Sequence, residues 1–430
     1  MKKLWFVLVI GMLVFLQCSG SKTTLSVTSL KEEPQVSVQK EMQYESFWEA
    51  LENLDFDYVS TQQATLQQHR FTDALKMVVS GNFDAAINDF RALYHTSNDS
   101  LVRVHSRTIL DNLLVFQSKW DELSALPNES DDTLNSETSL AAIYRQYPAE
   151  QYDFPAQPEE LPLELSISGS PVIPVQINGH KRKFWLDTGA GLTCIASDVA
   201  EECGVYSEEA GDITAQTATS KRVAIQPAVI KSVQIGKINI ENHPAIILNK
   251  RDLEFKLLGF IRILKVDGII GWNAIQNMDV KIDYKNRMVT LRKPVKMNRS
   301  VRNLFWLGYP IVRVSSQDGL PLYFGLDTGA NLTGLHDNIL KKIDVKDAQE
   351  VNSTVGSAGG FERIKTLKIP KLTLMLNRYS LQYENLVSHP QTGAEFIKLD
   401  GTFGSDLAAT GSLRIDSVNG RFEVEYPEDH

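Results

Sequence analysis

The chain has 430 residues, enough for two or three domains of ordinary size. Hydrophobic residues make up 43% and charged residues 23%, the balance of a globular protein with buried cores. The formal net charge is −9, so the chain lacks the basic excess that neutralises phosphates, and we expect no nucleic-acid partner.

Residues 1–18 have the pattern of a secretory signal. Two lysines precede a mostly apolar run that ends at Leu16, and small residues follow. This run is shorter than the roughly 20 residues of a membrane-spanning helix. Cys18 stands where a bacterial lipoprotein signal carries its lipid-modified cysteine, and cleavage after Gly20 by an ordinary signal peptidase is the competing interpretation. Both predict export to the cell envelope, either lipid-anchored to the membrane through Cys18 or periplasmic or secreted.

Polar residues dominate 19–44, which we expect to form a tether. Residues 45–147 have helical spacing of apolar side chains, for example at Ala86 and Phe90. The stretch from Gly81 to Phe90 resembles the second half of a tetratricopeptide repeat, and an unrelated small helical bundle is the alternative. The helical region is a candidate to scaffold, to bind a protein partner or to inhibit the rest of the chain. Prolines then mark a linker at 148–164.

After this linker the sequence changes to short β-rich segments separated by turns. Val172–Ile177 is a predicted strand that leads into Asn178 and Gly179, a hairpin signal. From Leu165 to the end we expect a mainly β structure.

A long internal repeat organises this β-rich part. Residues 184–193 read FWLDTGAGLT and residues 324–333 read FGLDTGANLT, with eight of ten positions identical. A downstream Asp-Gly motif and a closing hairpin recur in both copies at matching distances. The repeat predicts two lobes, 165–294 and 304–430, joined by a linker at 295–303.

The repeated motif also carries a family resemblance. A strand followed by Asp-Thr-Gly-Ala, and later by Ile269-Ile270-Gly271, resembles the retropepsin-like branch of aspartic peptidases. Retroviral members pair two identical chains that each supply one aspartate, whereas pepsin-like enzymes supply both from one chain. The resemblance covers about 260 residues. It implies two tandem acid-protease lobes related by a pseudo-twofold axis, preceded by a small all-α region.

Asp187 and Asp327 are the predicted catalytic residues, one from each lobe. Two carboxylates that share a proton cannot both ionise cheaply. One therefore takes a proton from a water molecule while the other donates to the scissile carbonyl, the chemistry of aspartic proteases. This mechanism requires no metal or organic cofactor, and the eight histidines show no metal-ligand spacing of the HExxH kind.

The residues that follow each aspartate are predicted to support its loop. Gly189 and Gly329 allow the sharp turn that presents the carboxylate. The resemblance implies that Thr188 and Thr328 hydrogen-bond across the pseudo-twofold axis and hold the two loops together.

A glycine-rich segment in the second lobe resembles the flap that covers substrate in bacterial retropepsin-like proteins. Its Gly356, Gly359 and Gly360 would let backbone amides approach a peptide and let the flap open. A loose hairpin tip is the plain alternative. The equivalent segment of the first lobe, near 214–221, lacks these glycines, which predicts an asymmetric cleft.

Two cysteines lie in the first lobe. Cys194 and Cys203 are nine residues apart and could pair in an oxidising envelope. The alternative is that Cys203 is a small core residue.

The function expected from these patterns is an aspartic endopeptidase that hydrolyses a peptide or protein substrate. The alternative is a catalytically silent binding or scaffold protein of the cell envelope with the same fold. Two intact Asp-Thr-Gly loops favour the enzyme, because a cleft that only binds has no need of two ionisable aspartates.

Overall fold

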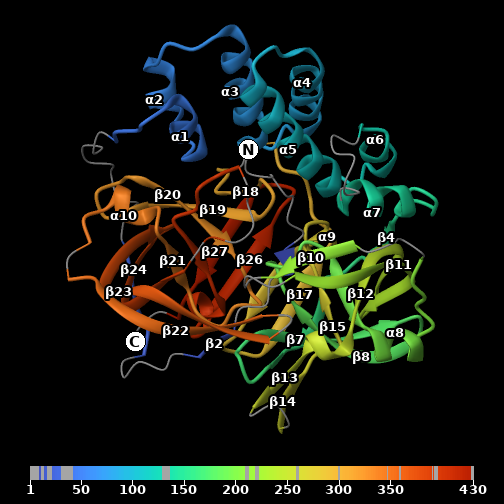
Figure 1. The fold of residues 1–430 in the computed structure, drawn as a ribbon. Coiled ribbons are helices and arrows are strands. Elements are labelled where there is room, and N and C mark those ends of the chain that lie inside the picture. The colour runs from blue at the N-terminus through green and yellow to red at the C-terminus, as the bar shows by residue number, and fades with distance from the viewer. Residues whose placement is uncertain are drawn as a thin grey trace.

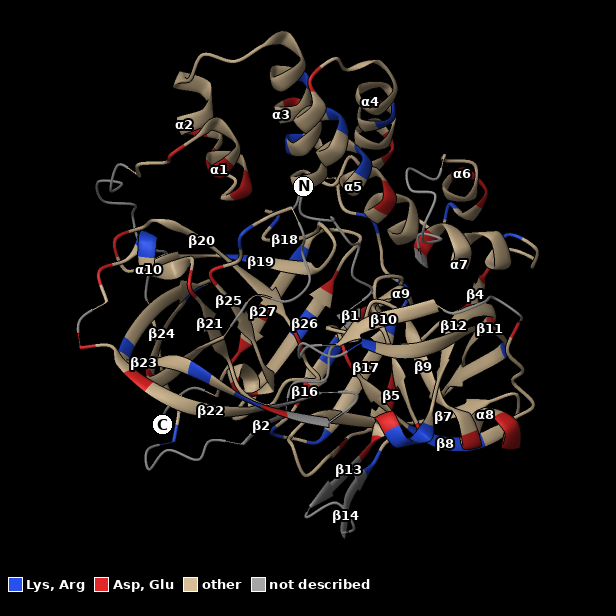
Figure 2. Cartoon of the chain, viewed as in Figure 1, with Lys and Arg blue, Asp and Glu red and all other residues tan. Residues whose placement is uncertain are grey.

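The computed structural model describes residues 9–10, 14–16, 22–30, 42–127, 136–208, 213–217, 222–257, 261–298, 301–345, 347–357, 360–389, 391 and 396–427. Within these ranges a group of helices covers one side of two β-rich lobes that stand next to each other (Figure 1). Acidic and basic residues are interspersed over the helices and both lobes (Figure 2). None of the helices in the described part is long and apolar enough to cross a membrane.

Helices occupy the region where helical periodicity is seen in the sequence. They are α1 (Phe47–Glu52), α2 (Phe56–Thr61), α3 (Leu66–Val79), α4 (Phe83–Thr96), α5 (Ser100–Phe116), α6 (Trp120–Ser124) and α7 (Ser136–Tyr144). Thr65 and Gln68 form a capping box at the start of α3, and Gly81, at φ +79°, makes the turn into α4. Their apolar faces form a core that includes Phe71 and Phe90, both fully buried. The tetratricopeptide resemblance stays a prediction.

The first lobe contains most of one ten-stranded sheet. Its elements are β7 (Pro171–Ile177), β8 (His180–Leu186), β9 (Thr193–Ala196), α8 (Ser197–Glu202), β10 (Ile213–Thr217), β11 (Arg222–Ile235), β12 (Ile238–Leu248), η1 (Lys250–Leu253), β13 (Glu254–Leu257), β14 (Ile261–Lys265), β15 (Gly268–Ile270), α9 (Trp272–Ile275), β16 (Asp279–Asp283) and β17 (Met288–Arg292). Strand β15 lies between β8, to which it is parallel, and β9, to which it is antiparallel.

The second lobe repeats this arrangement. Its elements are β18 (Leu304–Trp306), β19 (Pro310–Ser316), β20 (Pro321–Leu326), β21 (Gly334–His336), α10 (Ile339–Lys342), β22 (Gln349–Ser357), β23 (Gly360–Leu376), β24 (Tyr379–His389), β25 (Gly401–Phe403), η2 (Ser405–Ala408), β26 (Ser412–Asp416) and β27 (Arg421–Glu425). The order β19-β20-β25-β21-β24-β23-β22 matches β7-β8-β15-β9-β12-β11-β10 strand for strand. The repeat in the sequence is therefore a repeat in the fold.

A third sheet joins the lobes. Its strand order is β27-β26-β16-β17-β5, and β16 pairs antiparallel with β26 across the lobe boundary. Both closing hairpins therefore share one sheet, which fixes the two lobes side by side. Ile282 and Leu413 are register partners at this junction and both are buried.

Two segments expected to be irregular contain strands instead. The linker at 148–164 includes β4 (Gln151–Asp153), β5 (Glu159–Pro162) and the start of β6 (Glu164–Leu165), which pair with β12, β17 and β7. The tether at 19–44 includes β3 (Thr24–Ser29), which pairs with β24. The physical reason is that each segment meets an open sheet edge, and apolar residues such as Leu161 bury against the core there.

The N-terminal signal lies mostly outside the described residues, and so does Cys18. Two short strands from it are described: β1 (Val9–Ile10) beside β10, and β2 (Val14–Leu16) beside β22.

Candidate active site

Asp187 and Asp327 lie at the ends of equivalent strands, β8 and β20, and both are fully buried. The amide of Asp187 donates to the carbonyl of Ile270 at 3.1 Å, and the amide of Asp327 donates to that of Phe403 at 2.9 Å. Each aspartate is therefore fixed to the strand, β15 or β25, that begins at the glycine of the recurring Asp-Gly motif. In each lobe, the Asp-Thr-Gly motif and the Asp-Gly motif therefore lie next to each other.

The two loops are tied together by a symmetric set of hydrogen bonds. The amide of Thr188 donates to the Thr328 hydroxyl at 3.1 Å, and the amide of Thr328 donates to the Thr188 hydroxyl at 3.0 Å. Each hydroxyl in turn donates to a carbonyl of the opposite lobe, Leu326 for Thr188 and Leu186 for Thr328, both at 2.7 Å. The two amides and two hydroxyls of Thr188 and Thr328 are buried and paired, so these hydrogen bonds resist separation of the lobes.

Each aspartate carboxyl packs against the glycine of the opposite loop. A Cβ atom added at Gly189 would lie 2.5 Å from Cγ of Asp327, and one added at Gly329 would lie 2.3 Å from Oδ2 of Asp187. Only a residue without a side chain leaves room for these contacts. The glycine of each motif therefore has a second role besides the turn predicted from the sequence: it leaves space for the carboxyl of the other lobe.

Backbone donors hold one oxygen of each carboxyl. Gly189 N–H donates to Oδ1 of Asp187 at 2.8 Å, and Ala330 N–H donates to Oδ1 of Asp327 at 2.9 Å. Oδ2 of each aspartate is buried and has no hydrogen-bond partner of its own among the described residues.

The two carboxyls differ in proton affinity. Burial and the neighbouring Asp327 carboxylate raise the pKa of Asp187 well above its usual value. Burial also raises the pKa of Asp327, but hydrogen bonds from Asp187, from the amide of Ala330 and from the Tyr309 hydroxyl oppose that rise. The pair behaves as one titrating unit in which the proton favours Asp187.

Tyr309 makes the site asymmetric. It is buried and precedes Pro310, the first residue of β19. The residue that precedes the equivalent Pro171 is Ser170, whose hydroxyl donates to the carbonyl of Gly329 at 2.8 Å. Sequence reasoning missed both residues, although their shared place before the repeated proline was a visible signal.

A second repeated network braces the loops from behind. Thr193 accepts a hydrogen bond from Gly271 N–H, and Thr333 accepts one from Gly404 N–H, both at 3.2 Å. Asn273 accepts from the Thr193 amide at 2.9 Å, and at the equivalent place Asp406 accepts from Thr333 at 2.8 Å. Burial raises the pKa of Asp406 to about 6.

The candidate flap is a long hairpin of β22 and β23. Gly356 pairs with Phe361 and Ser357 pairs with Gly360, while Gly359 lies outside the described residues. Ile364 of this hairpin packs against Ala330, directly after the second Asp-Thr-Gly. The first-lobe equivalent is the hairpin of β10 and β11, whose connection at 218–221 is also outside the described residues.

Cys194 and Cys203 are both buried and unpaired with each other, which agrees with the interpretation of Cys203 as a core residue. Burial raises the pKa of both thiols. Among the residues that the structure describes, no group of three or more His, Cys, Asp or Glu side chains is placed to hold a metal ion.

Comparison with known proteins finds a family match within the first lobe. Residues 173–263 match the model of a family described as gag-polyprotein putative aspartyl protease. Among solved structures, the chain is similar to a retropepsin-like aspartic protease from Rickettsia conorii, with 19% sequence identity and a TM-score of 0.24. That match covers 33% of this chain and 97% of the other. No curated protein matches the chain. The residues matched by the family model lie in the first lobe and include Asp187 with its Asp-Thr-Gly loop.

Proposed function

We propose that the protein is an aspartic endopeptidase that hydrolyses peptide bonds with a dyad of Asp187 and Asp327. The observation that carries this proposal is the reciprocal packing of each carboxyl against the opposite loop's glycine. A pair that only stabilised the lobe boundary would cost free energy, because two buried carboxyls repel each other when ionised. Such an arrangement is expected where the shared proton takes part in a reaction.

In the proposed mechanism the two aspartates have different roles in the resting state. Asp327, which receives hydrogen bonds from Ala330 and Tyr309, stays ionised and takes a proton from the attacking water. Asp187, whose pKa is raised further, holds the shared proton and donates it to the scissile carbonyl oxygen. The two roles exchange as the tetrahedral intermediate collapses and the leaving nitrogen is protonated.

The hairpin edges support an extended peptide as the ligand. Val9–Ile10 adds to the edge of β10, and Val14–Leu16 adds to the edge of β22. Both edges can therefore hydrogen-bond an extended backbone, which is how strand addition binds peptides. Because the dyad is fully buried, a hairpin must move before a substrate reaches it.

Export to the cell envelope belongs to the same proposal. It rests on the signal pattern of residues 1–18, with Cys18 as the candidate site of lipid attachment. A protein partner of the helical region is a further part of the proposal.

The test is an assay of the full chain with an unfolded protein substrate across pH, with and without a statine-type inhibitor. We expect hydrolysis that the inhibitor blocks and that Asp187→Asn abolishes. A folded wild-type protein that cleaves nothing under any of these conditions would favour the alternative, a silent binding protein.

A further inference from the structure

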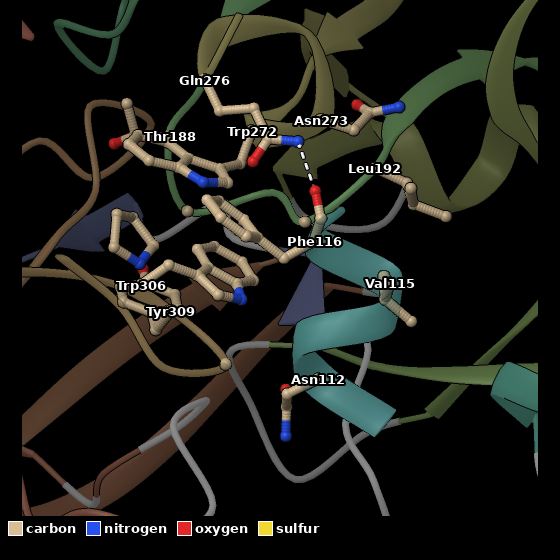
Figure 3. Close-up of a pocket in the computed structure, with 14 residues that line it drawn as sticks. Asn112, Val115, Phe116, Thr188, Leu192, Trp272, Asn273, Gln276, Trp306 and Tyr309 are labelled. Atoms are coloured by element: carbon tan, nitrogen blue, oxygen red, sulfur yellow. Dashed lines mark hydrogen bonds between the residues drawn. The ribbon is translucent and has the colours of Figure 1, made fainter. Parts of the chain in front are cut away.

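A row of stacked aromatic rings lines a cavity that Thr188 and Gly189 also border, and each ring comes from a different part of the chain (Figure 3). Trp272 of α9 and Trp306 of β18 stack with their ring centroids 5.8 Å apart and their planes 10° apart. Phe116, the last residue of α5, stacks on Trp306 at 5.3 Å and 12°. We call these three residues the aromatic wall. It joins the first lobe, the second lobe and the helical region.

Hydrogen bonds fix the helical region in this position. The side-chain amide of Gln276 donates to the carbonyl of Phe116 at 2.9 Å (Figure 3). Further along the same side, the Tyr144 hydroxyl of α7 donates to the carbonyl of Ala245 in β12 at 2.8 Å. All four residues of these two bonds are buried. These bonds hold the helical region on the first lobe at two places, one of them at Phe116 of the wall.

The space between the wall and the dyad is nearly filled. The cavity there has a volume of about 30 Å³ and is bounded by the wall, by Thr188 and Gly189, and by Tyr309. Gly189 and Tyr309 are the neighbours of the Asp327 carboxyl. A cavity of this size holds about one or two water molecules, so it does not hold an amino-acid side chain.

Among the described residues, the pseudo-symmetric position in the other lobe has no matching row of aromatic rings. Leu192, five residues after Asp187, is 2% exposed and lines the cavity. Its counterpart Leu332, five residues after Asp327, is only partly buried and packs on Ala330. The place of Trp272, directly after Gly271, is taken in the second lobe by the small Ser405. The two ends of the dyad therefore differ in the described side chains that surround them.

The wall also presents polar atoms that lack partners. The indole N–H groups of Trp272 and Trp306 and the side-chain oxygen of Gln276 are buried without a hydrogen-bond partner in the described part of the chain. All three side chains line the cavity. Buried polar groups of this kind cost free energy until a partner binds. The end of a polypeptide supplies both donors and acceptors, because its charged group stands beside a backbone amide.

We propose that the aromatic wall closes one end of the substrate path, so that the endopeptidase cuts internal peptide bonds that lie a few residues from one terminus of its substrate. This inference rests on the proposed function and narrows its substrate class to peptide chains that end close to the scissile bond on the walled side. On the opposite side no such wall stands among the described residues, so the chain can continue there once a hairpin has moved.

The test uses a fixed cleavable peptide that is extended by one residue at a time at its N-terminus or at its C-terminus. Wild-type full chain is expected to lose about tenfold or more in kcat/KM once the extension on one side meets the wall, and to tolerate extension on the other. The side that fails identifies which terminus the wall receives. Phe116→Ala, or Phe116→Leu if the alanine variant folds poorly, should reduce this loss to about threefold or less.

Phe83→Ala is the matched control. Phe83 packs on Phe116 with ring centroids 4.8 Å apart but does not line the cavity, so this change removes a similar volume and leaves the wall in place. It should keep the wild-type length dependence. Equal tolerance of extension on both sides in the wild type, or an unchanged loss in both Phe116 variants, overturns the inference.

Binding separates this inference from the proposed function. The same peptides are titrated into folded Asp187→Asn, with the fluorescence of its tryptophans as the readout. If the wild type cleaves no peptide but the affinity of Asp187→Asn falls with extension on one side only, the protease proposal fails and the wall proposal stands. If the wild type cleaves the peptides without any length dependence, the protease proposal stands and the wall proposal fails. If peptides are neither cleaved nor bound, both fail.

Discussion

Thr188 and Thr328 exchange two hydrogen bonds, each amide donating to the hydroxyl of the other residue at 3.1 Å and 3.0 Å. The exchange joins two loops that are 140 residues apart in the chain, and it places Asp187 and Asp327 on the same side of one rigid unit. A displacement of either loop therefore moves both carboxyls, so the geometry of the dyad depends on both lobes.

The first prediction concerns this bridge. Thr328→Val keeps the shape of the side chain but leaves the Thr188 amide and the Leu186 carbonyl without their partner, so the free energy of unfolding should fall by about 1–3 kcal/mol. Thr328→Ser keeps the hydroxyl and should lose clearly less. Urea denaturation of both variants measures the difference. Equal stability of the valine and serine variants would contradict a structural role for the hydroxyl.

The second prediction concerns the glycine against which the opposite carboxyl packs. Gly329 does not have a positive φ, so alanine is compatible with its backbone, but its Cβ would lie 2.3 Å from Oδ2 of Asp187. Gly329→Ala should displace that carboxyl and lower kcat by about 100-fold. Thermal unfolding serves as the control for folding. A kcat close to that of the wild type would show that the carboxyl does not need its present position.

The third prediction concerns the pH dependence of hydrolysis. The Tyr309 hydroxyl lowers the pKa of Asp327, the proposed base. Tyr309→Phe removes this donor, so the pKa rises and the acid limb of kcat/KM should move to higher pH. Ser170→Ala is the control, because Ser170 occupies the equivalent place but donates to the Gly329 carbonyl. A shift of equal size in both variants would assign the effect to general loosening of the loops.

The fourth prediction concerns stability against pH. The pKa of Asp406 is about 6 in the folded protein, above the ordinary value of roughly 3.9 that the unfolded chain has. Between these values the folded chain holds a proton that the unfolded chain has lost, so stability falls as pH rises. The free energy of unfolding of Asp406→Asn at pH 7 should therefore exceed that of the wild type by roughly 2–3 kcal/mol. This difference should shrink towards pH 4.

Asn273→Asp provides the converse control for that experiment. Asn273 makes the equivalent hydrogen bonds to Thr193, and its amide also donates to the carbonyl of Pro244 at 2.8 Å. A carboxylate there cannot donate, so this variant should be destabilised at pH 7. A gain for Asp406→Asn that is independent of pH would show that titration is not its cause.

The repeat and its two aspartates were visible in the sequence because they are local and nearly identical. The shared sheet between the lobes was not, since the pairing of Ile282 with Leu413 depends on two hairpins that are far apart in the chain. The same holds for β3 and β5, whose short apolar segments become strands only because an open sheet edge lies beside them. The aromatic wall combines three such distant segments, and no single stretch of the sequence indicates it.

Peptide hydrolysis by Asp187→Asn, Asp327→Asn and the double variant tests the central claim most directly. Because both carboxyls act on one water and share one proton, each single variant should lose activity as completely as the double variant does. All three should fold, since asparagine is nearly isosteric with aspartate, and circular dichroism and thermal unfolding check this. Near-full activity in either folded single variant would contradict the account, because the two aspartates would then not form one catalytic site.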